Sequence, residues 1–129
     1  MIKSYTNKEE SKTLAGILSI ETADMCYMEN TGSGNDLYNE NPTFFNGADI
    51  QENQLPCWSL AALRALLPWA LNFDGKTYIF ESHNAIDRSW VYSYRMGENT
   101  LIYVTSATVE DEINACYEVI LKLKKLNVL

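Results

Sequence analysis

The sequence contains little of the material from which chemical sites are usually built. His83 is its only histidine, and its three cysteines, Cys26, Cys57 and Cys116, are widely spaced without a C-x-x-C pair. A zinc site needs clustered Cys and His ligands, so we expect no metal and no cofactor. An odd number of cysteines at such spacings also argues against a disulfide framework and is typical of a reducing compartment. We therefore expect free, buried thiols.

Long apolar runs are missing as well. No stretch approaches the roughly 18 uninterrupted apolar residues that are needed to cross a bilayer. The first ten residues, MIKSYTNKEE, lack the apolar segment of a signal peptide. These two absences predict a cytoplasmic protein that does not associate with membranes.

Basic residues are absent from a long part of the chain. Between Thr13 and Leu63 there is no Lys or Arg, and the whole chain has ten basic against seventeen acidic residues, a net charge of −7. The acidic residues of this stretch are Glu21, Asp24, Glu29, Asp36, Glu40, Asp49 and Glu52. Such a surface repels phosphate backbones, so we expect no direct binding of nucleic acid. Two interpretations stay open: a solubilising surface, or a patch that attracts a protein partner with a basic surface.

What is present indicates an ordinary folded domain. The chain has 129 residues, of which 47% are apolar and 12% aromatic. This composition lies well away from that of disordered proteins, and the length suits one hydrophobic core. No repeat or linker divides the sequence. We therefore predict a single α+β domain over residues 1–129.

Two shorter helices are predicted from capping signals. Thr6-Asn7-Lys8-Glu9 has the form of a capping box, which predicts a helix that begins after Thr6 and ends near Leu18. Ser59 is the candidate N-cap of a second helix, which Pro68 stops at or before Leu67.

The clearest helix is expected at the C-terminal end of the chain, after Thr108. Lysines cluster near its end, where they complement the helix dipole. Its apolar residues follow steps of four and three, which gives one stripe for packing against a sheet: Val109, Ile113, Cys116, Ile120 and Leu123.

A short apolar-rich run predicts a strand at Ala23–Glu29. Three further strands, separated by turn residues, are predicted at Thr77–Ser82, Ser89–Arg95 and Thr100–Thr105. Asn46-Gly47 predicts a type I′ hairpin turn, because both positions of that turn require positive φ. The expected architecture is an antiparallel sheet of three to five strands, packed against two or three helices of which the longest is C-terminal.

Several short segments occur together in an order that spans nearly the whole chain. They are Glu9-Glu10-Ser11-Lys12, Thr22-Ala23-Asp24-Met25-Cys26-Tyr27, Leu55-Pro56-Cys57-Trp58-Ser59-Leu60, Leu66-Leu67-Pro68, and the helix after Thr108. In this order the chain resembles a family of small uncharacterised proteins encoded in phages, prophages and other mobile elements of gut bacteria. The resemblance implies a mobile-element context and brings no activity, cofactor or catalytic residue. The segment Asn30–Pro42 does not align with the pattern.

One arrangement of residues could carry chemistry. Cys57 precedes a predicted helix whose N-terminal dipole would lower the pKa of a thiol, and His83 with Asp87 could complete a Cys-His-Asp set. The alternative is that Pro56-Cys57-Trp58 is a hydrophobic lead-in that anchors the helix to the core.

The surplus of aromatic residues also has two interpretations. Trp90, Tyr92 and Tyr94 alternate along one strand and therefore share one face of the sheet. That face packs under the helices, or it forms a partly exposed patch for binding another protein.

The sequence leaves three functional hypotheses, from different classes. The first is a non-enzymatic accessory protein of a phage or mobile element that acts by protein binding. The second is a small cysteine-dependent hydrolase or transferase that uses Cys57 and His83. The third is a self-assembling structural component.

Overall fold

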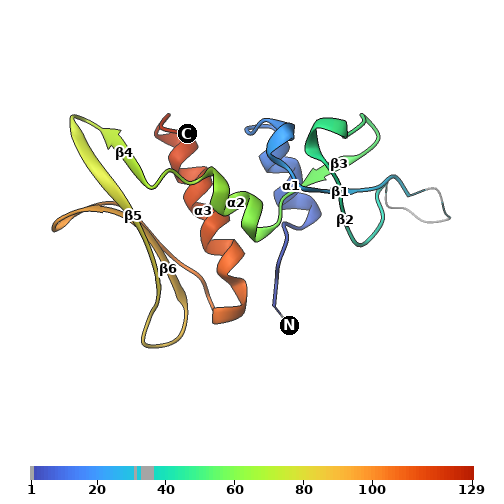
Figure 1. Ribbon diagram of the computed structural model, residues 1–129. Helices are drawn as coiled ribbons and strands as arrows, with labels where there is room; N and C mark the ends of the chain where they lie inside the picture. Colours follow the sequence, from blue (N-terminus) through green and yellow to red (C-terminus); the bar gives the residue numbers. More distant parts are fainter. Residues whose placement is uncertain (1, 31, 33–36) are drawn as a thin grey trace. The chain divides into compact units, whose positions relative to one another are not determined.

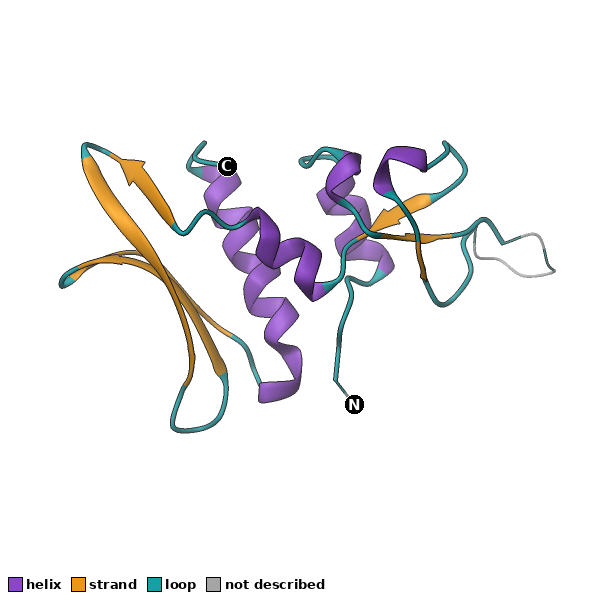
Figure 2. Cartoon of the chain, viewed as in Figure 1, coloured by secondary structure: helices purple, strands orange, loops and turns teal. Residues whose placement is uncertain are grey.

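The computed structural model describes residues 2–30, 32 and 37–129 (Figure 1). The chain divides into two compact units, which are described separately. We call Tyr5–Ala62 the N-terminal unit, and Met1–Ser4 together with Leu63–Leu129 the C-terminal unit. Helices and antiparallel sheets are both present, and the longest helix lies at the C-terminal end (Figure 2). The predicted α+β class is therefore confirmed.

The N-terminal unit contains a small antiparallel sheet in the order β2-β1-β3. Its central strand β1 pairs with both neighbours, and Met25 lies opposite Phe44 on one side and Cys57 on the other. The elements are α1 (Lys8–Ala15), η1 (Ile20–Thr22), β1 (Met25–Tyr27), β2 (Thr43–Phe44), η2 (Gly47–Asp49), β3 (Leu55–Cys57) and the start of α2 (Leu60–Leu66). The predicted strand Ala23–Glu29 is thus present in a shorter form. Most of the glycine-rich part of Asn30–Pro42 lies outside the described residues.

The first helix begins one residue later than the sequence predicted. Asn7 is its N-cap: the side chain accepts from the backbone N–H of Glu10, and the Glu10 carboxylate accepts from the N–H of Asn7. Thr6 instead turns inward and is fully buried. Both residues can cap a helix, so only the tertiary contacts of Thr6 decided between them.

The predicted hairpin at Asn46-Gly47 is wrong. Asn46 caps the short helix η2 and accepts from the N–H of Ala48 at 3.0 Å. Gly47 has no positive φ, but a Cβ atom there would lie 2.4 Å from the carbonyl oxygens of both Ile20 and Ala23. Glycine is needed at this position because backbone carbonyl oxygens approach it closely. Its φ angle does not require glycine.

The C-terminal unit is built on a second antiparallel sheet, in the order β4-β5-β6-β7. Its elements are β4 (Ala70–Phe73), β5 (Lys76–Asn84), β6 (Trp90–Met96), β7 (Asn99–Thr105), η3 (Val109–Asp111) and α3 (Glu112–Lys125). Three of the four strands were predicted. β4 was not predicted, because its four residues are too few to show a period. The turn Asp74-Gly75, with φ of 52° and 76°, returns the chain into β5.

The register of the second sheet places the central aromatic residues on one face. Tyr92 lies opposite Ser82 of β5 and Val104 of β7, and Tyr94 lies opposite Phe80. The Phe80 ring centroid is 5.5 Å from that of Tyr92 and 5.3 Å from that of Tyr94. The predicted alternation along this strand is confirmed.

Helix α3 covers this aromatic face of the sheet (Figure 2). Four of the five residues in its predicted stripe are buried: Ile113, Cys116, Ile120 and Leu123. Val109 is exposed because it belongs to the preceding turn η3, which Thr108 caps through the N–H of Glu110. Lys3 joins the same unit, since its ammonium group donates to the side chain of Asn114 at 2.7 Å. None of the described helices is long and apolar enough to cross a membrane.

Candidate functional site

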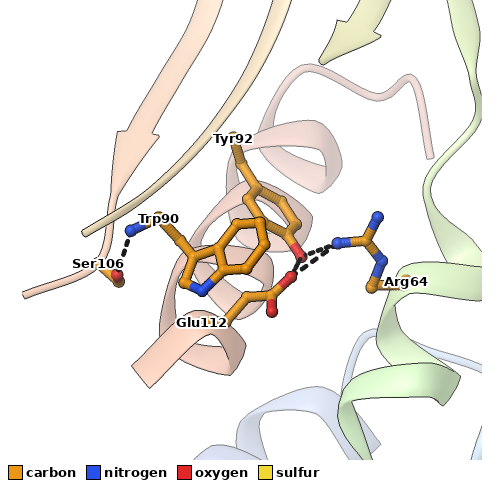
Figure 3. A network of polar contacts seen from close by, with 5 residues as sticks. All are labelled: Arg64, Trp90, Tyr92, Ser106 and Glu112. Atoms are coloured by element: carbon orange, nitrogen blue, oxygen red, sulfur yellow. Dashed lines mark hydrogen bonds and ion pairs between the residues drawn. The ribbon is translucent and has the colours of Figure 1, made fainter. Parts of the chain in front are cut away.

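Three side chains from three separate elements of the C-terminal unit meet in one polar network (Figure 3). Arg64 of α2 donates through Nη1 to the hydroxyl oxygen of Tyr92 and to Oε2 of Glu112, the latter at 2.7 Å. Tyr92 in turn donates its hydroxyl hydrogen to the same carboxylate oxygen. The ion pair is partly shielded, because the Glu112 side chain is 16% exposed. No local sequence pattern indicates this network, because its members are far apart along the chain.

The electrostatics of this network favour a fixed arrangement of protons. Burial, and then the hydrogen bond to Glu112, raise the pKa of Tyr92 well above its usual value. Burial opposes the charge of Arg64, but its contacts with Tyr92 and Glu112 outweigh that effect and raise its pKa. The tyrosine therefore stays protonated and the guanidinium stays charged. The arrangement suits a structural clamp between α2, β6 and α3 better than proton transfer near neutral pH.

The neighbouring aromatic residues are also held inside the unit. Tyr94 is fully buried and donates its hydroxyl hydrogen to the carbonyl oxygen of Pro68 at 2.6 Å. Trp90 is half-buried, and its backbone N–H donates to Oγ of Ser106 at 2.9 Å (Figure 3). Of the candidate binding residues, Tyr92 and Tyr94 therefore pack in the core. This agrees with the interpretation in which the aromatic face packs under the helices. Only Trp90 keeps some exposed surface.

Cys57 lies at the end of β3 in the N-terminal unit and is fully buried. Its thiol contacts the hydroxyl of Thr6 at 3.5 Å and donates to the carbonyl oxygen of Thr6 at 3.3 Å. Thr6 also bonds the hydroxyl of Ser11, and its carbonyl oxygen accepts from Tyr27. Burial raises the pKa of Cys57 more than hydrogen bonds from Thr6 and its neighbours lower it. These contacts describe a packed, protonated thiol that helps to satisfy buried polar groups.

His83 and Asp87 belong to the C-terminal unit, whereas Cys57 belongs to the other one. His83 and Asp87 line the same open depression of about 710 Å³ beside the β5–β6 turn. Asp87 accepts from both the N–H and the hydroxyl of Ser89, at 3.0 and 2.7 Å, and these bonds lower its pKa. Asp87 thus shapes the turn, and no hydrogen bond links it to His83 among the described contacts. The depression is open, and its described lining residues include no pair of groups poised for nucleophilic chemistry.

The other two thiols are equally enclosed. Cys26 and Cys116 are buried and free, and burial raises the pKa of both, that of Cys116 to about 12. Among the described residues, no group of three or more His, Cys, Asp or Glu side chains could hold a metal ion. The thiols therefore serve as small apolar core residues here.

The two units differ sharply in charge. By sequence, the N-terminal unit has two basic residues against nine acidic ones, whereas the C-terminal unit has eight of each sign. The whole net charge of −7 therefore belongs to Tyr5–Ala62. Of the six acidic residues that the structure describes in the stretch without basic residues, five are exposed: Glu21, Glu29, Glu40, Asp49 and Glu52.

Large apolar side chains are exposed on the same acidic unit. Phe44 of β2 is 79% exposed and Leu37 is 77% exposed. An open hollow of about 470 Å³ lies in this unit, with Tyr5, Tyr27 and Glu40 among its lining residues. Exposed large apolar side chains are a common feature of surfaces that bind other proteins.

Comparison of the chain with protein-family models, curated proteins and solved structures gave no match in any of the three. The mobile-element context therefore stays a prediction that rests on the order of sequence segments alone.

Proposed function

We propose that the protein is a non-enzymatic accessory protein that binds a protein partner with a basic surface. The observation that carries this proposal is the confinement of the entire net charge to the N-terminal unit. A field of one sign over one unit speeds the encounter with an oppositely charged partner and orients it. The mobile-element context, taken from the resemblance, belongs to the same proposal.

The exposed apolar residues can supply the buried contacts that make a complex long-lived, which charge alone does not provide. Rim charges mainly affect the rate of association and its salt dependence, whereas buried apolar contacts slow dissociation. Phe44 and Leu37 are available for such contacts in the acidic unit. We therefore place the partner surface around these residues and the exposed carboxylates.

An enzymatic function has less support. Cys57 is enclosed, its pKa is raised, and its thiol bonds Thr6 rather than a base. A thiol in this state is a poor nucleophile at neutral pH.

The test is capture of a partner from bacterial lysate by the immobilised full chain, at low and high salt. A first variant combines Glu21→Lys, Glu40→Lys and Glu52→Lys, all at exposed sites of the acidic unit. The matched control combines Glu81→Lys, Glu98→Lys and Glu118→Lys, which make the same change of net charge in the other unit.

We expect one stoichiometric partner, captured at low salt by the parent chain and by the control, and lost with the first variant. Recovery of no stoichiometric protein at either salt concentration contradicts the proposal. So does a partner that both variants lose to the same extent, because its binding would then follow net charge and not this surface.

A further inference from the structure

The four-stranded sheet of the C-terminal unit ends in a strand with a free edge. β7 is last in the order β4-β5-β6-β7, and its main contacts are with β6 along one edge and with α3 across one face. No other strand in the described part of the chain pairs with it. Its second edge therefore presents backbone groups that another chain could pair with.

The hydrogen bonding at the end of β7 shows which groups face outward. Ser106, the next residue after the strand, donates its N–H to the carbonyl oxygen of Trp90 in β6 at 2.8 Å. Inward and outward N–H groups alternate along an antiparallel strand, so Val104 also faces β6. The backbone groups of Tyr103 and Thr105 consequently point away from the sheet.

The composition of β7 does not protect this edge. Natural edge strands are usually guarded by lysine, proline or a bulge. The segment Asn99–Thr105 has no charged residue and no proline, and consists mainly of strand-forming residues. The register of β6 and β7 shifts between Tyr94 and Arg95, which places one irregularity near Leu101. The part from Ile102 onward remains regular.

Beside this edge lies a hollow with a basic rim. It measures about 240 Å³ and is lined by Leu101, Ile102, Leu126, Lys122 and Lys125. Both lysine side chains are exposed. The acidic residue nearest to β7 in the sequence is Glu98, in the turn before it. The hollow thus offers an apolar floor and two positive charges.

We propose that the free edge of β7 binds an extended, acidic segment of a partner protein as an additional strand. The outward backbone groups of Tyr103 and Thr105 would pair with that segment. Alternate side chains of the added strand would face the hollow, where carboxylates come within reach of Lys122 and Lys125. This is a second docking surface, separate from the acidic one proposed above.

Charge argues against a second copy of the chain at the same edge. If β7 paired with β7 of another copy about its middle, the hollows near Ile102 would approach each other. The two pairs of lysines would then lie close together, and like charges in proximity oppose pairing. An acidic segment reverses the sign of that interaction.

The probe is a synthetic peptide of the length of β7, in which glutamate alternates with valine. Two control peptides accompany it: one has lysine in place of each glutamate, and the other is the acidic peptide methylated on all of its backbone nitrogens. The methylated peptide keeps every side chain but cannot complete the strand ladder. Binding to the full chain is followed by NMR titration and by amide hydrogen exchange.

We expect the acidic peptide to bind, and to slow amide exchange at Tyr103 and Thr105. The lysine peptide and the methylated peptide should bind at least about tenfold more weakly, from the loss of two charge pairs or of the ladder. Lys122→Glu combined with Lys125→Glu should weaken binding of the acidic peptide roughly tenfold. Lys12→Glu combined with Lys76→Glu changes the net charge equally at exposed sites that do not line the hollow, and should leave binding unchanged.

Three results would each overturn the proposal. The acidic peptide fails to bind; the methylated peptide binds as well as its parent; or light scattering shows a dimer whose formation protects Tyr103 and Thr105, which assigns the edge to a second copy. The Glu→Lys variants of the N-terminal unit leave this edge intact, so failure here is distinguishable from failure of the proposed acidic surface.

Discussion

Tyr92 donates its hydroxyl hydrogen to the carboxylate of Glu112, twenty positions further along the chain. Tyr92 lies in β6 and Glu112 is the first residue of α3, so the bond fixes where the helix begins against the sheet. Arg64 bonds both partners and so adds α2 to the same contact. One polar contact therefore coordinates three elements of the C-terminal unit.

Tyr92→Phe should lower the free energy of unfolding by about 2 to 3 kcal/mol. The variant keeps the ring and its contact with Phe80, but it removes hydrogen bonds to two charged groups. Urea denaturation measures the change. Tyr94→Phe is the matched control: it loses one bond to a carbonyl oxygen and should cost about 1 kcal/mol. Equal losses of unfolding free energy in the two variants would show that the charged partners of Tyr92 add no stability beyond that of an ordinary hydrogen bond.

Gly47→Ala should destabilise the protein by at least about 2 kcal/mol. The added Cβ atom would lie 2.4 Å from two backbone carbonyl oxygens, so the backbone must shift to admit it. Gly16→Ala is the control, because a Cβ atom there would be 3.5 Å from its nearest neighbour, an ordinary contact. Thermal denaturation compares the two variants. A Gly47→Ala protein as stable as the parent would refute the close approach.

Cys57 should react with iodoacetamide on the order of a hundredfold more slowly than a model thiol at neutral pH. The thiol is fully buried and its pKa is raised, so reaction requires local opening of about 3 kcal/mol. Mass spectrometry of the labelled native chain measures the rate, and labelling in urea supplies the unprotected reference. Rapid labelling of native Cys57 would contradict the structural role and favour the enzyme hypothesis.

The free energy of unfolding should fall as the pH rises above about 9. Burial raises the pKa of Cys116 from its usual 9.0 to about 12, so between these values the unfolded chain loses a proton that the folded chain retains. Each such group lowers stability by about 1.4 kcal/mol per pH unit within its window. The buried Tyr92 and Tyr94, whose pKa values are also raised, act in the same direction.

Urea denaturation at a series of pH values tests this dependence. Cys116→Ala removes one titrating group, so its stability should fall less steeply than that of the parent between pH 9 and 12. A free energy of unfolding that is constant or rises over this window would contradict the prediction.

Local patterns predicted most of the secondary structure of this chain. Ser59 accepts from the N–H of Ala62 at the start of α2, as its N-cap position predicted. The period of two along β6 placed Tyr92 and Tyr94 on one face, and the steps of four and three placed Cys116 in the buried stripe of α3. These features follow from residues close together in the sequence, where periodicity and capping act.

The same local patterns failed where distant backbone decided the outcome. Gly47 looked like a turn residue, but it is required by the carbonyl oxygens of Ile20 and Ala23. Thr6 looked like an N-cap, but it is buried against Cys57, fifty-one positions away. A pattern of neighbouring residue types carries no information about such contacts.

By itself, the sequence determined the α+β class, the amphipathic C-terminal helix and the long stretch without basic residues, because each follows from composition or short-range period. Only the tertiary structure decided that Tyr92 is clamped between Arg64 and Glu112, that Cys57 is enclosed, and that β7 ends a sheet beside two lysines. The physical reason is that burial, polar pairing and a free strand edge depend on which distant segments meet, and folding alone brings those segments together.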